Sequence, residues 1–228
     1  MRQLWSETTP TVVVLAMTAA LSVTFLAGQS EMPIDAHAVW HPSQNDLTLI
    51  RKSCDTMRFP ALGACFARGM QRAGASEQAI ALTHRLNDEA YLNKFIESGR
   101  VDLAFVTYPY RANQNEACLL VNGNPAIIDV DDLRQLPQEA MKRDEGYRSL
   151  AEKNPNVSLW AGDRSDLSTV IPGALGGGGQ RFIIGYWLLD GCHACARLAT
   201  VKFGFDFDAG GKFLGAKFLS LQKTGDQR

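Results

Sequence analysis

Two cysteines, in Cys192-His-Ala-Cys195, form the motif with the most direct chemistry in this sequence. Where such a pair opens a helix, the helix N-terminus lowers the pKa of the first thiol and makes it a nucleophile for disulfide exchange. Here the pair stands between two predicted strands, with no βαβ pattern around it. We therefore favour a structural disulfide that pins the loop. The alternative is a thiol–disulfide redox protein that uses Cys192 and Cys195, with His193 tuning the thiolate.

The same motif does not complete a metal or haem site. A structural zinc site needs four ligands, and no second C-x-x-C or H-x-x-x-H pattern supplies the missing ones. Covalent haem attachment needs a His directly after the second Cys, and Ala196 stands there instead. The sequence therefore predicts no metal and no cofactor.

The other cysteines are Cys54, Cys65 and Cys118. Cys54 and Cys65 lie on either side of Pro60 and Gly63, so the chain can turn and bring them together. Cys118 stands in a short apolar run and is expected to be a free, buried thiol. We expect the pairs Cys54–Cys65 and Cys192–Cys195, although spacing alone leaves other connectivities open.

Aspartates and glycines form further patterns that could bind ions. Asp129-Val-Asp-Asp132 is predicted to cap a helix, and Asp206-Phe-Asp208 is predicted to be a solvent-facing alternation that leads into a turn. Neither matches a Ca²⁺ loop. The run from Gly173 to Gly179 lacks the Lys-Ser/Thr of a phosphate loop and precedes a strand, so we expect a flexible connector.

One loop has the composition of a recognition surface: Tyr108-Pro-Tyr-Arg-Ala-Asn-Gln-Asn115. Tyr and Arg supply much of the binding energy at interfaces, and the loop lies between predicted strands. The candidate binding residues are Tyr108, Tyr110, Arg111 and Asn113. A purely structural loop has the same composition and is the alternative. The sequence contains no Gly-x-Ser-x-Gly motif and no triad spacing, so we favour a protein that is not an enzyme.

The N-terminal region carries a predicted export segment. No ionisable side chain occurs from Thr8 to Ser30, and residues 11–27 are almost continuously apolar after Arg2. The length of this run lies between that of a signal-peptide core and that of a spanning helix. We expect a signal peptide or an uncleaved membrane anchor in residues 1–30, a connector in 31–46 and an exported domain in 47–228. Export to the periplasm, or to the periplasmic face of the inner membrane, also makes disulfides expected.

Composition excludes several classes of protein. The chain has 228 residues with 23 Lys and Arg against 24 Asp and Glu, a net charge of −1. Near-neutral charge with 46% hydrophobic residues argues against a nucleic-acid binder and against a disordered chain. The length suits one core of ordinary size.

The periodicity of the apolar residues predicts an α+β domain. Helices are expected at 59–72, 77–86, 89–98, 132–141 and 144–152. Strands are expected at 101–108, 119–121, 126–128, 157–160, 182–189, 199–207 and 212–221. The last three strands form a three-stranded antiparallel meander, and the helices upstream are expected to pack on an antiparallel sheet.

Resemblances to known groups of proteins imply a location for this chain but no activity. The Tyr108–Asn115 run, Val121-Asn-Gly123, Ile128-Asp-Val-Asp131 and Gly191-Cys-His-Ala-Cys195 together resemble patterns in exported proteins of Gram-negative bacteria. The four residues Cys192–Cys195 also resemble the active site of thioredoxin-like periplasmic oxidants. The C-terminal layout is loosely similar to periplasmic inhibitors of vertebrate lysozyme, but the loop here is too short to enter an enzyme cleft in the same way.

The sequence therefore favours an exported, non-catalytic domain that is stabilised by disulfides. Its expected partner is an envelope protein or another cell-envelope component, with membrane contact through residues 11–27 if the leader is uncleaved.

Overall fold

The computed structural model describes residues 32–112, 115–165 and 169–225. The chain divides into a unit of residues 1–32 and a unit of residues 33–228, and the description below concerns the second. The predicted leader in residues 1–30 lies outside the described residues. Within the described ranges, we find no helix with the length and apolar character needed to cross a membrane.

The first sheet is antiparallel and has the strand order β1-β2-β3-β4. Its strands are β1 (Tyr91–Ile96), β2 (Asp102–Thr107), β3 (Glu116–Val121) and β4 (Ile127–Asp129). The β3–β4 hairpin forms around Asn122-Gly123, as the sequence predicts. Strand β2 is buried on both faces, which explains its unbroken apolar run.

The second sheet has the order β5-β7-β8-β9, with β6 also paired to β7. Its strands are β5 (Val157–Ala161), β6 (Val170–Leu175), β7 (Gly179–Asp190), β8 (Arg197–Phe207) and β9 (Phe213–Lys223). The predicted C-terminal meander is confirmed as β7-β8-β9. Five alternate residues of β8, from Ala199 to Phe207, are 0% exposed, because they fill the face that points into the core.

The other elements of the described residues are five short α-helices and three 3-10 turns. The α-helices are α1 (Gln44–Cys54), α2 (Ala61–Arg72), α3 (Glu77–Arg85), α4 (Gln138–Lys142) and α5 (Glu145–Lys153). The 3-10 turns are η1 (Ala36–Ala38), η2 (Leu133–Gln135) and η4 (Gly176–Gly178). Ser76 and Asp144 cap α3 and α5. Helix α1 begins inside the expected connector, and Trp40 in that connector is buried in the core.

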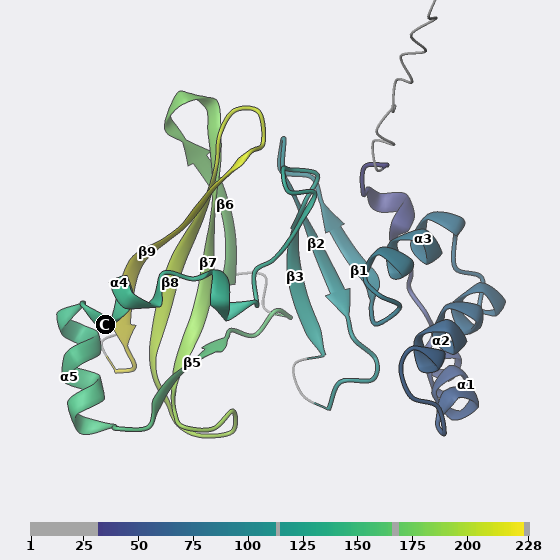
Figure 1. Ribbon diagram of the computed structural model, residues 1–228, viewed down its shortest axis with the longest axis horizontal. Coiled ribbons are helices and arrows are strands. Elements are labelled where there is room, and N and C mark those ends of the chain that lie inside the picture. Colours follow the sequence, from purple (N-terminus) through teal and green to yellow (C-terminus); the bar gives the residue numbers. More distant parts are fainter. Residues whose placement is uncertain (1–31, 113–114, 166–168, 226–228) are drawn as a thin grey trace, which may run out of the picture. The chain divides into compact units, whose positions relative to one another are not determined.

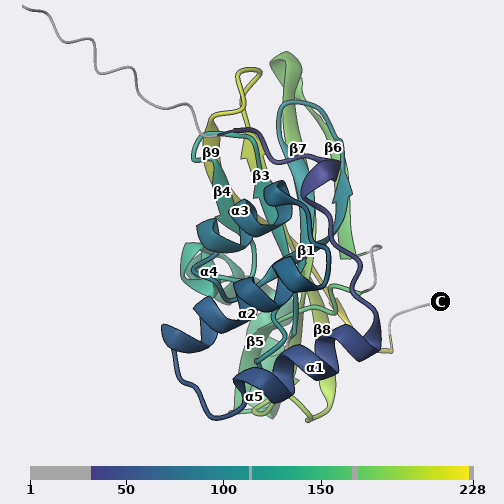
Figure 2. The ribbon, with the colours of Figure 1, turned by 90° about the vertical axis from the view of Figure 1, so that its right-hand side faces the viewer.

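Helices and sheets form layers around shared cores, which Figures 1 and 2 show from two sides. One face of β2, with Leu103 and Phe105, packs against the second sheet in a core that includes Phe182 and Phe203. The opposite face packs against α3 through Leu82. A third cluster holds α1 and α2 around the Cys54–Cys65 disulfide. The predicted fold class, α+β with helices packed on antiparallel sheet, is confirmed.

Three predicted elements are wrong in detail. The helix expected over 89–98 is strand β1, whose register shifts between Leu92 and Lys94. The extra residue, Asn93, breaks the two-residue alternation, so the apolar spacing imitates a helix. The helix expected over 132–141 is split into η2 and α4 around Pro137, which has no N–H to continue the helix.

The third correction concerns the glycine-rich run from Gly173 to Gly179. Instead of a flexible connector, its first residues belong to β6, which pairs with β7 from Val170 to Leu175. Gly177 and Gly178 have φ values of 75° and 80°, a conformation that suits glycine in a tight hairpin turn. The glycines therefore build a turn between two paired strands.

The side chain of Gln180 links the second sheet to the first. The Gln180 side chain on β7 accepts hydrogen bonds from the backbone N–H groups of Arg100 and Val101 at 2.8 and 2.9 Å. It also donates to the backbone oxygens of Ser98 and Val101 at 2.8 and 3.1 Å. These four bonds hold the β1–β2 turn against β7.

We predict that Gln180→Ala lowers the free energy of unfolding by about 1–2 kcal/mol, because partly buried backbone groups lose their partners. Urea unfolding followed by circular dichroism measures this change. Gln222→Ala, at an exposed position on β9, is the matched control and should change stability by less than about 0.5 kcal/mol. Equal losses in the two variants would contradict the assigned role of Gln180.

Candidate functional site

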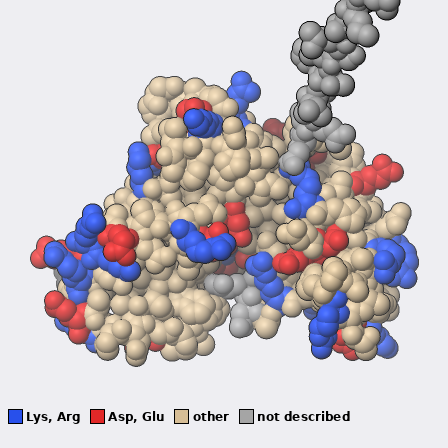
Figure 3. All heavy atoms as spheres, in the orientation of Figure 1, with Lys and Arg blue, Asp and Glu red and all other residues tan. Residues whose placement is uncertain are grey.

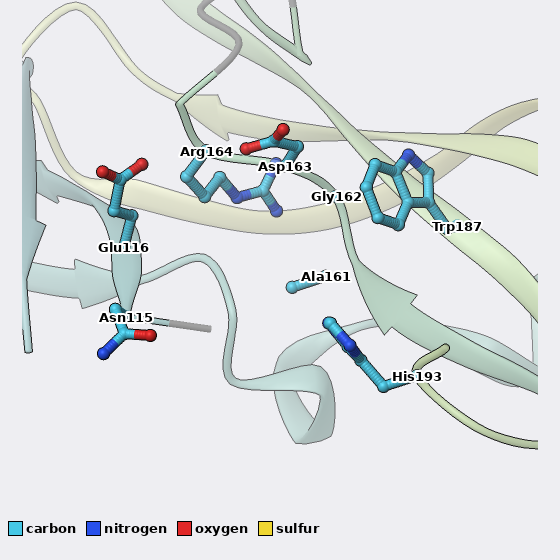
Figure 4. Close-up of a pocket in the computed structure, with 8 residues that line it drawn as sticks. All are labelled: Asn115, Glu116, Ala161, Gly162, Asp163, Arg164, Trp187 and His193. Atoms are coloured by element: carbon cyan, nitrogen blue, oxygen red, sulfur yellow. The ribbon is translucent and has the colours of Figure 1, made fainter. Parts of the chain in front are cut away.

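A surface pocket of about 400 Å³ gathers residues from four distant segments of the chain. Its lining consists of Asn115, Glu116, Ala161, Gly162, Asp163, Arg164, Trp187 and His193. Figure 4 shows these side chains around one open space, with Glu116 and Asn115 on one side and Trp187 and His193 on the other. The pocket therefore joins the start of β3, the end of β5, strand β7 and the β7–β8 turn.

The local fold at this pocket depends on a loop that leaves the second sheet and returns to it. Strands β5 and β6 both pair with β7, with β5 ending opposite Tyr186 and β6 beginning opposite Ile184. The intervening chain leaves at Gly162, where an added Cβ would lie 2.7 Å from the backbone oxygen of Gly185. Only glycine fits so close an approach without a shift of the backbone.

Arg164 anchors this loop in the protein interior. Its side chain is 1% exposed, and its Nε and Nη2 donate to the Asp131 carboxylate at 2.9 and 2.6 Å. Its Nη1 donates to the backbone oxygen of Gly185 at 2.9 Å. The guanidinium also lies 5.1 Å from the centre of the Tyr186 ring. A buried charge is tolerated because it is paired and hydrogen-bonded.

Two ionisable side chains near Arg164, Tyr186 and Cys118, are buried, and burial disfavours their charged forms. Burial raises the pKa of the Tyr186 hydroxyl, which donates to the backbone oxygen of Val130. Burial likewise raises the pKa of the Cys118 thiol, which is 0% exposed. Cys118 is thus a free, buried thiol, as the sequence predicts, and a raised pKa makes it a poor nucleophile at neutral pH.

Asp131 was expected to begin a helix, and that expectation is wrong because its carboxylate pairs with Arg164. The neighbouring aspartates, Asp129 and Asp132, accept hydrogen bonds from the backbone. Asp132 accepts from the backbone N–H of Arg134 and caps η2, and Asp129 accepts from the backbone N–H of Asp131. Burial raises the pKa of Asp129.

The Cys192–Cys195 pair lies in the β7–β8 turn, where it forms a disulfide. Cys192 follows the end of β7 at Asp190 and begins no helix in this fully described segment. The helix N-terminus that lowers the pKa of the first thiol in thioredoxin-like sites is therefore missing there. The disulfide closes the turn that presents His193 to the pocket.

His193 packs against an aromatic residue of β5. Its ring lies 5.4 Å from that of Trp160 in an edge-on arrangement. Trp160 stands opposite Trp187 in the strand register, and its indole N–H donates to the hydroxyl of Ser158. Ser158 in turn donates to the backbone oxygen of Gly191, which ties β5 to the cysteine-bounded turn.

A second hollow of about 210 Å³ adjoins the first. It is lined by Asn93, Lys94, Phe105, Glu116, Arg164 and Ser165. The two hollows share Glu116 and Arg164, so together they form one groove, which we call the inter-sheet groove. The groove runs from His193 in the second sheet to Lys94 in the first.

The groove has exposed polar groups with unused bonding capacity. Among the described residues, the Glu116 carboxylate has no hydrogen-bond or ion-pair partner. Asp163 is exposed and uses one carboxylate oxygen to accept from the N–H and hydroxyl of Ser165, at 2.9 and 2.6 Å. These carboxylates can accept hydrogen bonds from a bound molecule.

Of the predicted binding residues, Tyr108 belongs to one buried cluster and Tyr110 packs against another, and neither they nor Arg111 line the groove. Tyr108 is 6% exposed, and the guanidinium of Arg111 stacks 3.2 Å from the centre of its ring. Tyr110 packs on Phe66 in the cluster around the Cys54–Cys65 disulfide. Asn113 lies outside the described residues.

The same loop reaches the groove through its last residue. The side-chain amide of Asn115 donates to the backbone oxygens of Tyr108 and Arg111, which closes the loop. Asn115 also lines the pocket. Of the residues singled out from the sequence, the structure therefore brings together His193, Asn115 and, through Arg164, Asp131.

Sequence reasoning missed Glu116, Asp163, Arg164 and Trp187. Arg164 stands in a polar loop, where a charged residue is normally exposed. Trp187 lies in a strand that reads as uniformly buried. Only the short run Gly162-Asp163-Arg164, a break after a strand, gave a local signal of a special loop.

Two observations concern the charged and metal-binding side chains of the described residues. In the described ranges, His, Cys, Asp and Glu side chains form no group of three or more that could hold a metal ion. On the face shown in Figure 3, Lys and Arg are interspersed with Asp and Glu, with no broad basic surface.

Comparison with protein-family models, curated proteins and solved structures found no match to this chain. The geometry of the groove therefore carries the functional argument.

Proposed function

We propose that this chain is an extracytoplasmic, non-catalytic binding domain, stabilised by two disulfides, that takes its ligand in the inter-sheet groove. The expected ligand is an envelope protein or another component of the cell envelope. The two disulfides support an oxidising compartment, and the apolar run 11–27 supports export.

The observation that carries this proposal is the pocket around Arg164. A buried ion pair, Asp131–Arg164, holds a loop at a sheet junction so that exposed Asp163 faces Glu116 of the other sheet. Binding sites are commonly built from loops that a rigid scaffold positions. The exposed Glu116 carboxylate has no partner among the residues that the structure describes, so it can accept hydrogen bonds from a ligand.

The disulfides have separate roles in this proposal. Cys54–Cys65 joins the end of α1 to α2 beneath the aromatic cluster, where it stabilises the fold. Cys192–Cys195 restricts the turn that carries His193, which lowers the entropy lost when a ligand contacts that ring.

Photo-crosslinking in cells that produce the full chain tests the proposal. We expect benzoylphenylalanine at Asp163 or at His193 to give a covalent adduct with an extracytoplasmic component after irradiation. The same group at Gln71, an exposed residue of α2, is the matched control and should give no adduct.

The adducts are separated by cell fraction and identified by mass. Adducts at both groove positions, in the extracytoplasmic fraction, support the proposal. An adduct of equal yield at Gln71, absence of adducts at both groove positions, or recovery of the chain in the cytoplasm contradicts it.

A further inference from the structure

We infer that the inter-sheet groove binds an uncharged oligosaccharide segment of the cell envelope. This inference rests on the proposed function and adds the chemical class of the ligand. It follows from the length of the groove, from the kinds of side chain that line it and from the ligand classes that its charges disfavour.

The groove suits an elongated molecule. Its two hollows, of about 400 and 210 Å³, meet at Glu116 above the buried side chain of Arg164. A single small molecule would occupy one hollow, whereas a chain of several linked units can contact both. Affinity should therefore increase with the length of the ligand.

The lining combines polar groups of both hydrogen-bonding types with aromatic surface. The carboxylate oxygens of Glu116 and Asp163 and the amide oxygen of Asn115 can accept hydrogen bonds from a ligand, whereas the Asn115 N–H groups already donate to Tyr108 and Arg111. Donors come from Lys94 and from the Asn93 amide, which uses one N–H on Thr107 and keeps the other. A sugar hydroxyl both donates and accepts, so it can bond to all of these groups. The ring of Trp187, which is partly buried and has Arg197 over its ring, provides apolar surface against which the C–H face of a sugar ring can pack.

Anionic ligands are disfavoured because the Arg164 guanidinium, the cation at the centre of the groove, is already paired. Three of the nitrogen atoms of Arg164 donate to Asp131 and Gly185, and its charge is neutralised by the Asp131 carboxylate. The exposed carboxylates of Glu116 and Asp163 would repel an anion.

A strongly cationic ligand would be attracted by Glu116 and Asp163 in the first hollow, but it would be repelled by Lys94 in the second, so it cannot occupy both hollows without a penalty. A purely apolar ligand would bury the Glu116 carboxylate without a partner, at a high desolvation cost. An uncharged, hydroxyl-rich chain avoids all of these penalties.

Titration of the purified domain with neutral tetrasaccharides tests this inference, with tetra-N-acetylglucosamine, cellotetraose and maltotetraose as the probes. We expect at least one of them to bind saturably and about tenfold more tightly than its own disaccharide. Nuclear magnetic resonance should place the shifts at the Trp187 indole N–H and the Glu116 amide. Tetralysine is the cationic comparison and should bind more weakly.

Two variants localise the interaction. Glu116→Gln keeps the size of the side chain and removes its charge, so we expect the Kd to rise about tenfold, the loss of one charge-assisted hydrogen bond. Glu152→Gln, at an exposed position on α5, should leave the Kd unchanged. Because Glu116 has no described partner, the variant should keep the melting temperature of the native chain.

Each failure has a distinct meaning. If no tetrasaccharide binds but groove positions crosslink to a protein, the saccharide inference is overturned and the proposed function stands. Tighter binding of tetralysine, or saccharide binding that Glu116→Gln leaves unchanged, also overturns the inference. If neither saccharides nor crosslinks report on the groove, both proposals fail.

Discussion

Replacing Arg164 by alanine should lower the free energy of unfolding by about 3–5 kcal/mol. The guanidinium is 1% exposed and donates to Asp131 and to the backbone oxygen of Gly185. Its removal leaves the Asp131 carboxylate, 14% exposed, without a counter-charge in a low-dielectric environment. Denaturant unfolding at neutral pH measures the loss.

A matched surface pair provides the control for this prediction. Arg134 makes an ion pair with Asp132 at 2.7 Å, but its side chain is 91% exposed, so Arg134→Ala should leave stability nearly unchanged. The double variant Arg164→Met with Asp131→Leu should recover much of the loss, because it removes both charges and fills the space with apolar atoms. A stable Arg164→Ala variant would show that the pair is not the anchor of the loop.

The Arg164 variants also separate folding from binding. The double variant should fold, yet it lacks the hydrogen bond from Arg164 to Gly185 that fixes the loop carrying Asp163. We therefore expect it to bind groove ligands more weakly than the native chain although its stability is similar. Such a result would assign Arg164 a positioning role in addition to its structural one.

The structural features that could be predicted from the sequence are those whose signal lies within one short segment of the chain. The alternation from Ala199 to Phe207 predicts β8 because one face of the strand is buried along its whole length. The apolar spacing within 77–86 and 144–152 predicts helices α3 and α5 because a helical stripe repeats every three or four residues. The cysteine pairs follow because each is close in the chain.

Features that depend on contacts between residues far apart in the chain could not be predicted from the sequence. The bulge at Asn93 turns a strand pattern into an apparent helical one, and nothing in the segment itself reveals it. Arg164 and Asp131 are far apart in sequence, and each has an ordinary local explanation as a loop residue or a helix cap. The groove lies where the two sheets meet, so its lining is a property of the tertiary fold.

The burial of Asp206 likewise could not be predicted from the sequence, because it depends on neighbouring strands. The alternation of β8 predicts that it faces solvent, and its side chain does lie on the outer face. Nevertheless it is 0% exposed, because Arg181 on β7 and Lys217 on β9 cover it. The Arg181 guanidinium binds both carboxylate oxygens, at 2.6 and 2.7 Å, and Lys217 approaches one of them to 2.9 Å. Two neighbouring strands therefore convert an apparent surface residue into a buried ion-pair centre, whereas Asp208 forms the predicted turn.

Replacing Asp206 by asparagine should lower the free energy of unfolding by about 2–3 kcal/mol at pH 7. Asparagine keeps the shape of the side chain but loses the charge that Arg181 and Lys217 surround. The loss stays below that expected for Arg164→Ala because both cations can turn toward water once their partner is neutral. Asp190→Asn, at an exposed position at the end of β7, is the control and should change stability by less than about 0.5 kcal/mol.

The effect of Asp206→Asn should depend on pH in a defined direction. The hydrogen bonds from Arg181 lower the pKa of the Asp206 carboxyl in the folded chain below its ordinary value. Its contribution is therefore fully present above the unfolded-state pKa of about 4 and is lost as the pH falls through the folded-state pKa. Because asparagine does not titrate, the stability gap between native chain and variant should be constant from about pH 5 to 7 and shrink below about pH 4. A gap that widens on acidification would mean that the folded chain favours the protonated carboxyl, contrary to the geometry of the three strands.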